Sequence, residues 1–165
     1  MLLEEFNAST RDAALDVVKP ALDVPRWYDA IVDGRPYASI EALTDAAMTV
    51  AAPLAEAELD AALAHHPRIG ERADGNSREA GMSRSEQAGV DPADSAVQEA
   101  LRRGNLAYEE RFGRVFLIRA AGRTAPEVLA ELRRRLDNDE ATERAETVAQ
   151  LREIALLRLP EVVGA

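Results

Sequence analysis

The two histidines of the chain stand next to each other in the stretch ALAHHPRIGER, residues 61–71. Because an imidazole has a pKa near 6.5, either ring could take or give a proton at neutral pH. On a helix with about 100° per residue, His66 shares a face with the apolar Leu63, whereas His65 falls beside Glu58. Helical spacing therefore directs His66 toward the core and predicts that His65 is a surface residue.

Pro67 leaves two interpretations of His66 open. A residue before proline is disfavoured in the α conformation, which makes His66 the last or capping residue of its helix. In one interpretation the imidazole satisfies the final carbonyls of that helix. In the other it transfers protons, because the glycine-containing loop over residues 67–82 would give a ligand access to it. Adjacent histidines point apart and no third ligand has a suitable spacing, so we expect no metal site.

Three further side chains could take part in chemistry. Ser83 and Glu86 have the spacing of a capping box, so the Glu86 carboxylate could return to its own helix N-terminus or contact a ligand. Gln87 has no such structural role. Arg158 lies among leucines in ALLRLP, and its guanidinium either extends outward to water or is held inward by an anion.

The composition narrows the possible partners. The chain of 165 residues carries a formal net charge of −10 and its arginines alternate with acids, so no nucleic-acid partner is expected. No stretch has the roughly 20 apolar residues of a membrane span, and the first ten residues carry acids where a signal peptide carries Lys or Arg. The absence of cysteine excludes disulfides and thiolate zinc sites. We expect a cytoplasmic protein with no membrane partner.

Apolar periodicity and capping residues predict an all-α fold in one compact domain over residues 1–165. A short buried run near residues 115–121, between two glycines, is the one segment expected to be extended. The arginine run at 133–135 is typical of a solvated helix face. About seven to eight helices are expected, over residues 9–18, 25–33, 40–51, 54–65, after Ser83, from 91 or 92 to about 111, from 124 to about 136, and from 138 or 139 to Leu159, where Pro160 ends the last helix.

Seven short stretches together resemble a known family. They occur in the order LLEEFN near the start, RW at 26–27, HPRIGER at 66–72, SRSEQAG at 83–89, NLAYEERFGRVFLIRAAGR at 105–123, RLDND at 135–139 and EIALLRL at 153–159. In this order they resemble the 2-oxo-4-hydroxy-4-carboxy-5-ureidoimidazoline (OHCU) decarboxylases of urate catabolism. The resemblance spans nearly the whole chain, although residues 73–81 and 20–25 show no clear family pattern.

The resemblance implies an all-α enzyme without a cofactor, usually a homodimer, that converts its substrate to (S)-allantoin and CO₂. It implies that His66, the histidine before proline, is catalytic and that Pro67 belongs to the pocket wall. The Ser-x-x-Glu-Gln element corresponds to ligand contacts from Ser83, Glu86 and Gln87. The remaining implied site residues are Phe116, Leu117, Ile118, Arg119, Ala120 and the helix arginine Arg158.

The expected reaction explains these residue types. Loss of CO₂ leaves electron density that must be held and then protonated on one face, which requires a fixed proton donor and a nearby cation. His66 would exchange protons with the hydroxyl and the nascent carbanion, while Arg158 would pair with the anionic part of the substrate. Glu86, also assigned to catalysis, and Gln87 would anchor the ureido arm. The extended segment would offer backbone donors and acceptors to the ring.

A protein with this negative charge must also build a locally positive pocket for an anion, and Arg68, Arg72 and Arg158 are available for it. Two alternatives stay open at this point. The chain could be a non-catalytic helical interaction module, or an enzyme on the same scaffold with another small anionic substrate.

Overall fold

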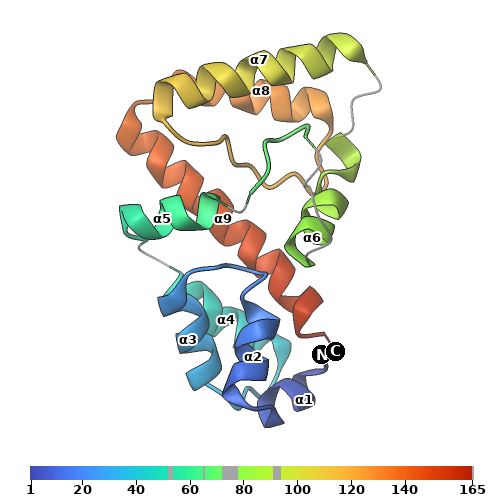
Figure 1. Cartoon of the computed structure of the whole chain (residues 1–165), viewed down its shortest axis with the longest axis vertical. Helices are drawn as coiled ribbons and strands as arrows, with labels where there is room; N and C mark the ends of the chain where they lie inside the picture. Colours follow the sequence, from blue (N-terminus) through green and yellow to red (C-terminus); the bar gives the residue numbers. More distant parts are fainter. Residues whose placement is uncertain (52–53, 65, 72–77, 91–93, 165) are drawn as a thin grey trace. The chain divides into compact units, whose positions relative to one another are not determined.

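The structure is a computed structural model that describes residues 1–51, 54–64, 66–71, 78–90 and 94–164. In these ranges the secondary structure is helical, without a strand, and the predicted all-α fold is confirmed. The helices are α1 (Leu3–Ala8), α2 (Arg11–Val18), α3 (Pro25–Asp33), α4 (Ile40–Val50), α5 (Glu56–Leu63), α6 (Arg78–Glu86), the 3-10 helix η1 (Ala88–Val90), α7 (Ser95–Phe112), α8 (Ala125–Arg135) and α9 (Glu140–Val162) (Figure 1).

Contacts along the chain divide it into two compact units. The first comprises Met1–Ala62 with Arg152–Ala165, and the second comprises Leu63–Leu151. The boundaries fall inside α5 and α9. The expectation of one domain over residues 1–165 stays a prediction. None of the described helices is long and apolar enough to cross a membrane.

Two helices of the first unit begin at side-chain caps, and α2, which was predicted from residue 9, begins at Arg11. Thr10 accepts a hydrogen bond from a backbone N–H of α2, and Ser39 does the same for α4. Trp27 on α3 is fully buried, and its indole Nε1 donates to the carbonyl of Ala47 on α4 at 3.1 Å. This bond lets the large indole enter the core without an unpaired donor.

The second unit has its core between α7 and α8. Gly104 is needed there, because a Cβ at this position would lie 2.5 Å from a methyl group of Leu132 on α8. Tyr108, Phe112 and Phe116 stack beside this crossing, with ring centroids 4.8 Å apart for the first two. Phe116, which follows α7 in the chain, therefore packs against the α7 residue Tyr108 close to the contact between α7 and α8.

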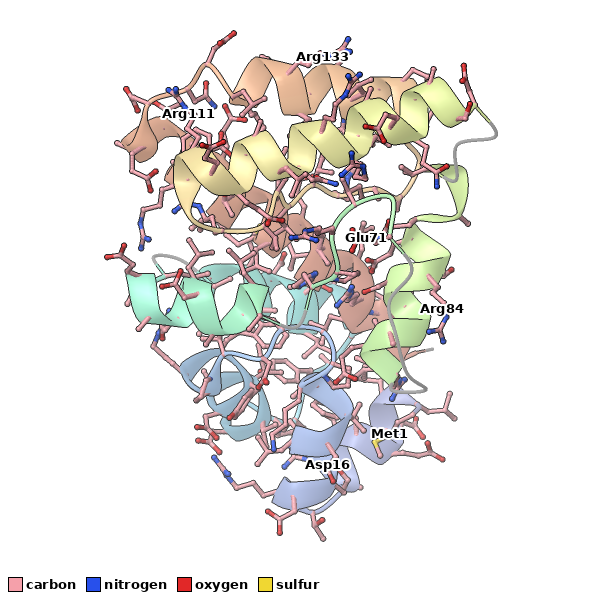
Figure 2. All side chains as sticks on the ribbon, turned by 45° about the horizontal axis from the view of Figure 1, so that its top comes forward. Met1, Asp16, Glu71, Arg84, Arg111 and Arg133 are labelled. Atoms are coloured by element: carbon pink, nitrogen blue, oxygen red, sulfur yellow. The ribbon has the colours of Figure 1, made fainter. Side chains whose placement is uncertain are left out.

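A fully buried polar network lies beside these rings, and it corrects one prediction. Of the run at 133–135, Arg133 is exposed and projects outward in Figure 2, whereas Arg135 is 1% exposed. The Arg135 guanidinium pairs with Glu143 and lies 4.7 Å from the centre of the Phe116 ring. Glu143 also accepts from the Tyr108 hydroxyl. Burial, followed by this hydrogen bond, raises the pKa of Tyr108.

Three predicted helix ends differ from the structure. α5 ends at Leu63 rather than near residue 65, in keeping with the restriction that Pro67 places on the residue before it. α6 begins at Arg78, inside the stretch 67–82 that was predicted to be a loop, and it already includes Ser83, so Ser83 cannot be the capping residue that its spacing to Glu86 suggested. α9 continues past Pro160 to Val162, because a proline in the last turn removes only one hydrogen bond and Val163 still donates to the Leu159 carbonyl.

The other ends agree more closely with the sequence. The capping box of Thr124 and Glu127 is confirmed, since the Thr124 backbone N–H donates to the Glu127 carboxylate at 2.7 Å. α7 is capped by Asp94, and residues 91–93 lie outside the described residues. The helix missed in the sequence is α1, which is only six residues long.

Candidate functional site

His66 begins a short loop over residues 66–71, directly after the end of α5. Its backbone N–H donates to the Leu63 carbonyl at 3.0 Å, which closes a turn rather than continuing the helix. The predicted helical face therefore does not set the direction of the imidazole. The residue is half-buried, so its ring lies at the border of core and solvent. His65 lies outside the described residues.

The loop after His66 is held in place at three consecutive residues. The Arg68 guanidinium forms a bidentate ion pair with Glu109 on α7, with N–O distances of 2.6 and 2.8 Å. The next carbonyl, that of Ile69, accepts a hydrogen bond from the Asn105 side chain at 2.9 Å. The Gly70 N–H donates to the Gln87 amide oxygen, also at 2.9 Å. The loop is thus bonded to α7 on one side and to the end of α6 on the other.

Arg68 therefore does not contribute the unpaired positive charge that its sequence position suggested. Glu109 neutralises it, and the Glu71 carboxylate lies 3.6 Å from the third guanidinium nitrogen. The hydrogen bonds from Arg68 hold the pKa of the Glu109 carboxyl below its usual value. Arg72, named for the same purpose, lies outside the described residues.

Ser83, Glu86 and Gln87 follow one face of α6 into its C-terminus. Their i, i+3 and i+4 spacing brings the three side chains together. Ser83 is buried, Glu86 is half-buried, and neither has the capping role inferred from their spacing because the helix begins at Arg78. Gln87 does have a structural role, its bond to Gly70, which corrects the sequence interpretation.

The predicted extended segment is present, and its backbone is paired on one edge. Arg135 donates to the Leu117 carbonyl at 2.7 Å, the Gln150 side chain accepts from the Arg119 N–H at 2.8 Å, and Arg123 donates to the Arg119 carbonyl. In an extended chain, alternate residues direct their N–H and C=O groups to opposite edges. Among the described residues, the N–H and C=O of Ile118 have no hydrogen-bond partner.

A hydrophobic cluster joins the parts of the candidate site in the second unit. It includes Ile69 from the loop, Val90 from η1, and Phe116, Ile118 and Ala120 from the extended segment. The unit also holds His66, Pro67, Ser83, Glu86 and Gln87. Of the predicted site residues, ten belong to this unit, over residues 66–67, 83, 86–87 and 116–120.

Arg158 belongs to the first unit. It is 3% exposed, and its guanidinium donates to the carbonyl of Pro20 at 3.3 Å. Of the two orientations considered from the sequence, the structure has the inward one. A buried guanidinium keeps its positive charge, so it carries a charge that a ligand anion could complement.

Four residues that position these segments were missed in the sequence: Asn105, Glu109, Arg135 and Gln150. Asn105 and Glu109 stand four residues apart in a helical stretch, a spacing that places both on one face. Arg135 follows the buried Val128 and Leu132 at helical spacing, so the apolar stripe could have indicated its burial. No cluster of His, Cys, Asp or Glu suited to a metal ion occurs in the part of the chain that the structure describes.

Comparison with known proteins gives the same family as the motifs. The family model described as OHCU decarboxylase matches residues 7–160. A 2-oxo-4-hydroxy-4-carboxy-5-ureidoimidazoline decarboxylase of Haloferax volcanii is 25% identical over 162 residues, which is 98% of this chain and 95% of the relative. A protein of the same name from Amia calva is 30% identical over 136 residues, 81% of this chain and 78% of the relative.

Two solved structures share the fold. One is a crystal structure of an OHCU decarboxylase in the presence of (S)-allantoin, with a TM-score of 0.71, 20% identity, and coverage of 88% of this chain and 96% of the other. The second is a crystal structure of an (S)-allantoin synthase, with a TM-score of 0.72 and 15% identity, and it covers 99% of this chain and 54% of the other. At these identities the likeness extends to the fold alone.

Proposed function

Because this chain belongs to the OHCU decarboxylase family, we propose that it removes CO₂ from 2-oxo-4-hydroxy-4-carboxy-5-ureidoimidazoline and yields (S)-allantoin in urate degradation. The family match over residues 7–160 is the observation that carries the proposal, because it includes every proposed site residue. The resemblance implies no cofactor, and the proposal includes none.

His66 is the proposed proton-transfer group. When the C–CO₂ bond breaks, its electron pair stays on the substrate, and the carbon must then receive a proton from one face. A half-buried imidazole at the start of an anchored loop suits this task, because its position is restrained while its ring can still meet a ligand. Pro67, the next residue, is assigned to the pocket wall, and Glu86 is assigned to catalysis together with His66.

The extended segment is the proposed docking edge for the substrate ring. The Ile118 N–H and C=O, which have no hydrogen-bond partner among the described residues, suit the acceptors and donors of an imidazoline ring, while the pairing of Leu117 and Arg119 keeps the segment in place. Phe116 and Ala120 are assigned to substrate contacts on the same segment, where the Ala120 carbonyl already accepts from the Arg123 N–H. Ser83 and Gln87 are assigned to the ureido arm, with Gln87 also keeping its bond to Gly70.

Arg158 is the proposed partner of the substrate anion. Its guanidinium has the planar geometry that binds a carboxylate through two hydrogen bonds, and its burial strengthens such an interaction. Arg158→Ala should raise KM or lower kcat without preventing folding, and an unchanged rate would remove it from the site. We also propose a homodimer, as the resemblance implies, and a cytoplasmic location.

The direct test generates the unstable substrate in place. Urate is treated with urate oxidase and hydroxyisourate hydrolase, this protein is added, and allantoin is followed by circular dichroism. The proposal predicts rapid formation of one enantiomer. If the wild-type protein leaves the slow racemic background unchanged, the chain either acts on another small anion or is not catalytic.

A further inference from the structure

The stretch NLAYEERFG on α7 contains two side chains to which the proposed function assigns no role. Asn105 and Glu109 stand one helical turn apart, and both contact the loop that begins at His66. Their partners Ile69 and Arg68 are consecutive residues of that loop. Two motifs that are far apart in the sequence, HPRIGER and NLAYEERFG, are therefore bonded to each other.

Each of the two contacts restrains the loop in a different way. The Asn105 amide is 3% exposed and donates to a main-chain carbonyl, so it fixes the backbone at Ile69. The Oδ1 atom of Asn105 has no hydrogen-bond partner within the described residues, so the side chain is held there by the bond from its Nδ2 to the Ile69 carbonyl. The Glu109 carboxylate engages two nitrogens of the Arg68 guanidinium, and a bidentate pair restrains orientation as well as distance.

Only two peptide bonds separate His66 from the restrained residue Arg68. Pro67 stands between His66 and Arg68, and its ring fixes φ, so this link has little freedom of its own. On its other side the His66 N–H is bonded to Leu63. The backbone that carries the imidazole is thus held before and after the residue.

We infer that Asn105 and Glu109 are positioning residues for His66, which act through the 68–70 loop and do not touch the substrate. This inference rests on the proposed function for its kinetic consequence. Displacing a catalytic group by about 1 Å can cost on the order of a hundredfold in rate. Loss of either α7 contact should therefore lower kcat far more than it changes KM or the melting temperature.

The kinetic test compares Glu109→Gln with Glu99→Gln. Glu99 forms an exposed ion pair on the same helix, with Arg102, and within the described residues it has no hydrogen bond or ion pair to the loop. We expect Glu109→Gln and Asn105→Leu to lose on the order of tenfold to a hundredfold in kcat. Glu99→Gln should behave as wild type. Equal kcat values for Glu109→Gln and Glu99→Gln would overturn the inference.

A double-mutant cycle separates positioning from direct contact with the substrate. If Arg68 and Glu109 act only as a pair, Arg68→Gln combined with Glu109→Gln should cost no more in kcat than either change alone. Additive losses, or a rise in KM confined to Arg68→Gln, would mean that Arg68 binds the substrate itself and would contradict the inference.

A measurement without substrate tests the inference independently of the proposed function. The imidazole C–H signals of the two histidines can be assigned by NMR with His65→Ala and His66→Ala. Glu109→Gln should shift or broaden the His66 signal, and Glu99→Gln should leave it unchanged. An unaltered His66 signal in Glu109→Gln would refute the positioning role. If instead the signal moves but the wild-type protein forms no allantoin, the proposed function fails and the positioning role stands.

Discussion

The two backbone segments of the candidate site in the second unit are held by different kinds of contact. The 66–71 loop depends on an ion pair whose side chains are 40% and 24% exposed, together with two single hydrogen bonds. The 116–120 segment depends on Arg135 and Glu143, which are 1% and 0% exposed. Exposed ion pairs contribute little to stability, whereas a broken buried pair leaves a charge without a partner. Substitutions around the loop should therefore affect activity more than stability, and those in the buried network should affect stability first.

The largest effect on stability is expected from Glu143→Ala. The change removes the buried acid of the Arg135 guanidinium and leaves only the partly exposed Glu146 carboxylate, 3.7 Å from its Nε, which should cost about 3–5 kcal/mol of unfolding free energy. Chemical denaturation measures this difference. Glu140→Gln is the control on the same helix, because the Glu140 side chain is 60% exposed, although its partner Arg114 is only 10% exposed. A cost for Glu143→Ala as small as that of the control would show that the network is not a structural core.

A smaller loss of stability is expected from removing the contact that Gln150 makes with Arg119 of the 116–120 segment. Gln150→Ala leaves the Arg119 N–H without its acceptor, which should cost about 1–2 kcal/mol. Gln150→Glu keeps an oxygen at this position and should retain most of the stability. Thermal unfolding of the two variants provides the comparison, and equal losses would mean that the amide contributes something other than this bond.

A still smaller stability effect is expected for the ion pair of the loop. Glu109→Gln should cost no more than about 1 kcal/mol at neutral pH. A loss as large as that of Glu143→Ala would erase the distinction between the two segments.

The contribution of the Arg68–Glu109 ion pair to stability should fall as the pH is lowered. The pKa of Glu109 is lowered in the folded protein, so its contribution is complete above the ordinary glutamate pKa of about 4.3 and is lost as the pH falls through the lower folded value. The difference in stability between wild type and Glu109→Gln should therefore shrink between pH 7 and pH 3. A difference that grows on acidification would contradict the assignment.

Local patterns in the sequence were sufficient where neighbouring residues decide the structure. The spacing of Thr124 and Glu127 predicted a capping box that the structure contains. Ser83 and Glu86 have the same spacing, yet Ser83 lies inside α6 because the residues before it are already helical. A capping pattern therefore identifies a helix start only when the preceding residues do not form helix themselves.

Candidate site residues could be named from the sequence, whereas the residues that hold their backbone in place could not. His66 and the 116–120 segment were named from residue chemistry and motif order. The supports act across long stretches of chain, as Asn105 does on Ile69 and Arg135 does on Leu117. Such pairings depend on how helices pack, and spacing along one helix does not contain that information.

We propose that this chain is an OHCU decarboxylase in which His66 transfers the proton. The most direct test is the rate of (S)-allantoin formation by wild type and by His66→Ala, with the urate-derived substrate generated in place. We expect the wild type to be active and His66→Ala to lose on the order of a hundredfold to ten-thousandfold in rate with its helical circular dichroism unchanged. His65→Ala, by contrast, should remain active. A His66→Ala variant that keeps the wild-type rate would contradict the account.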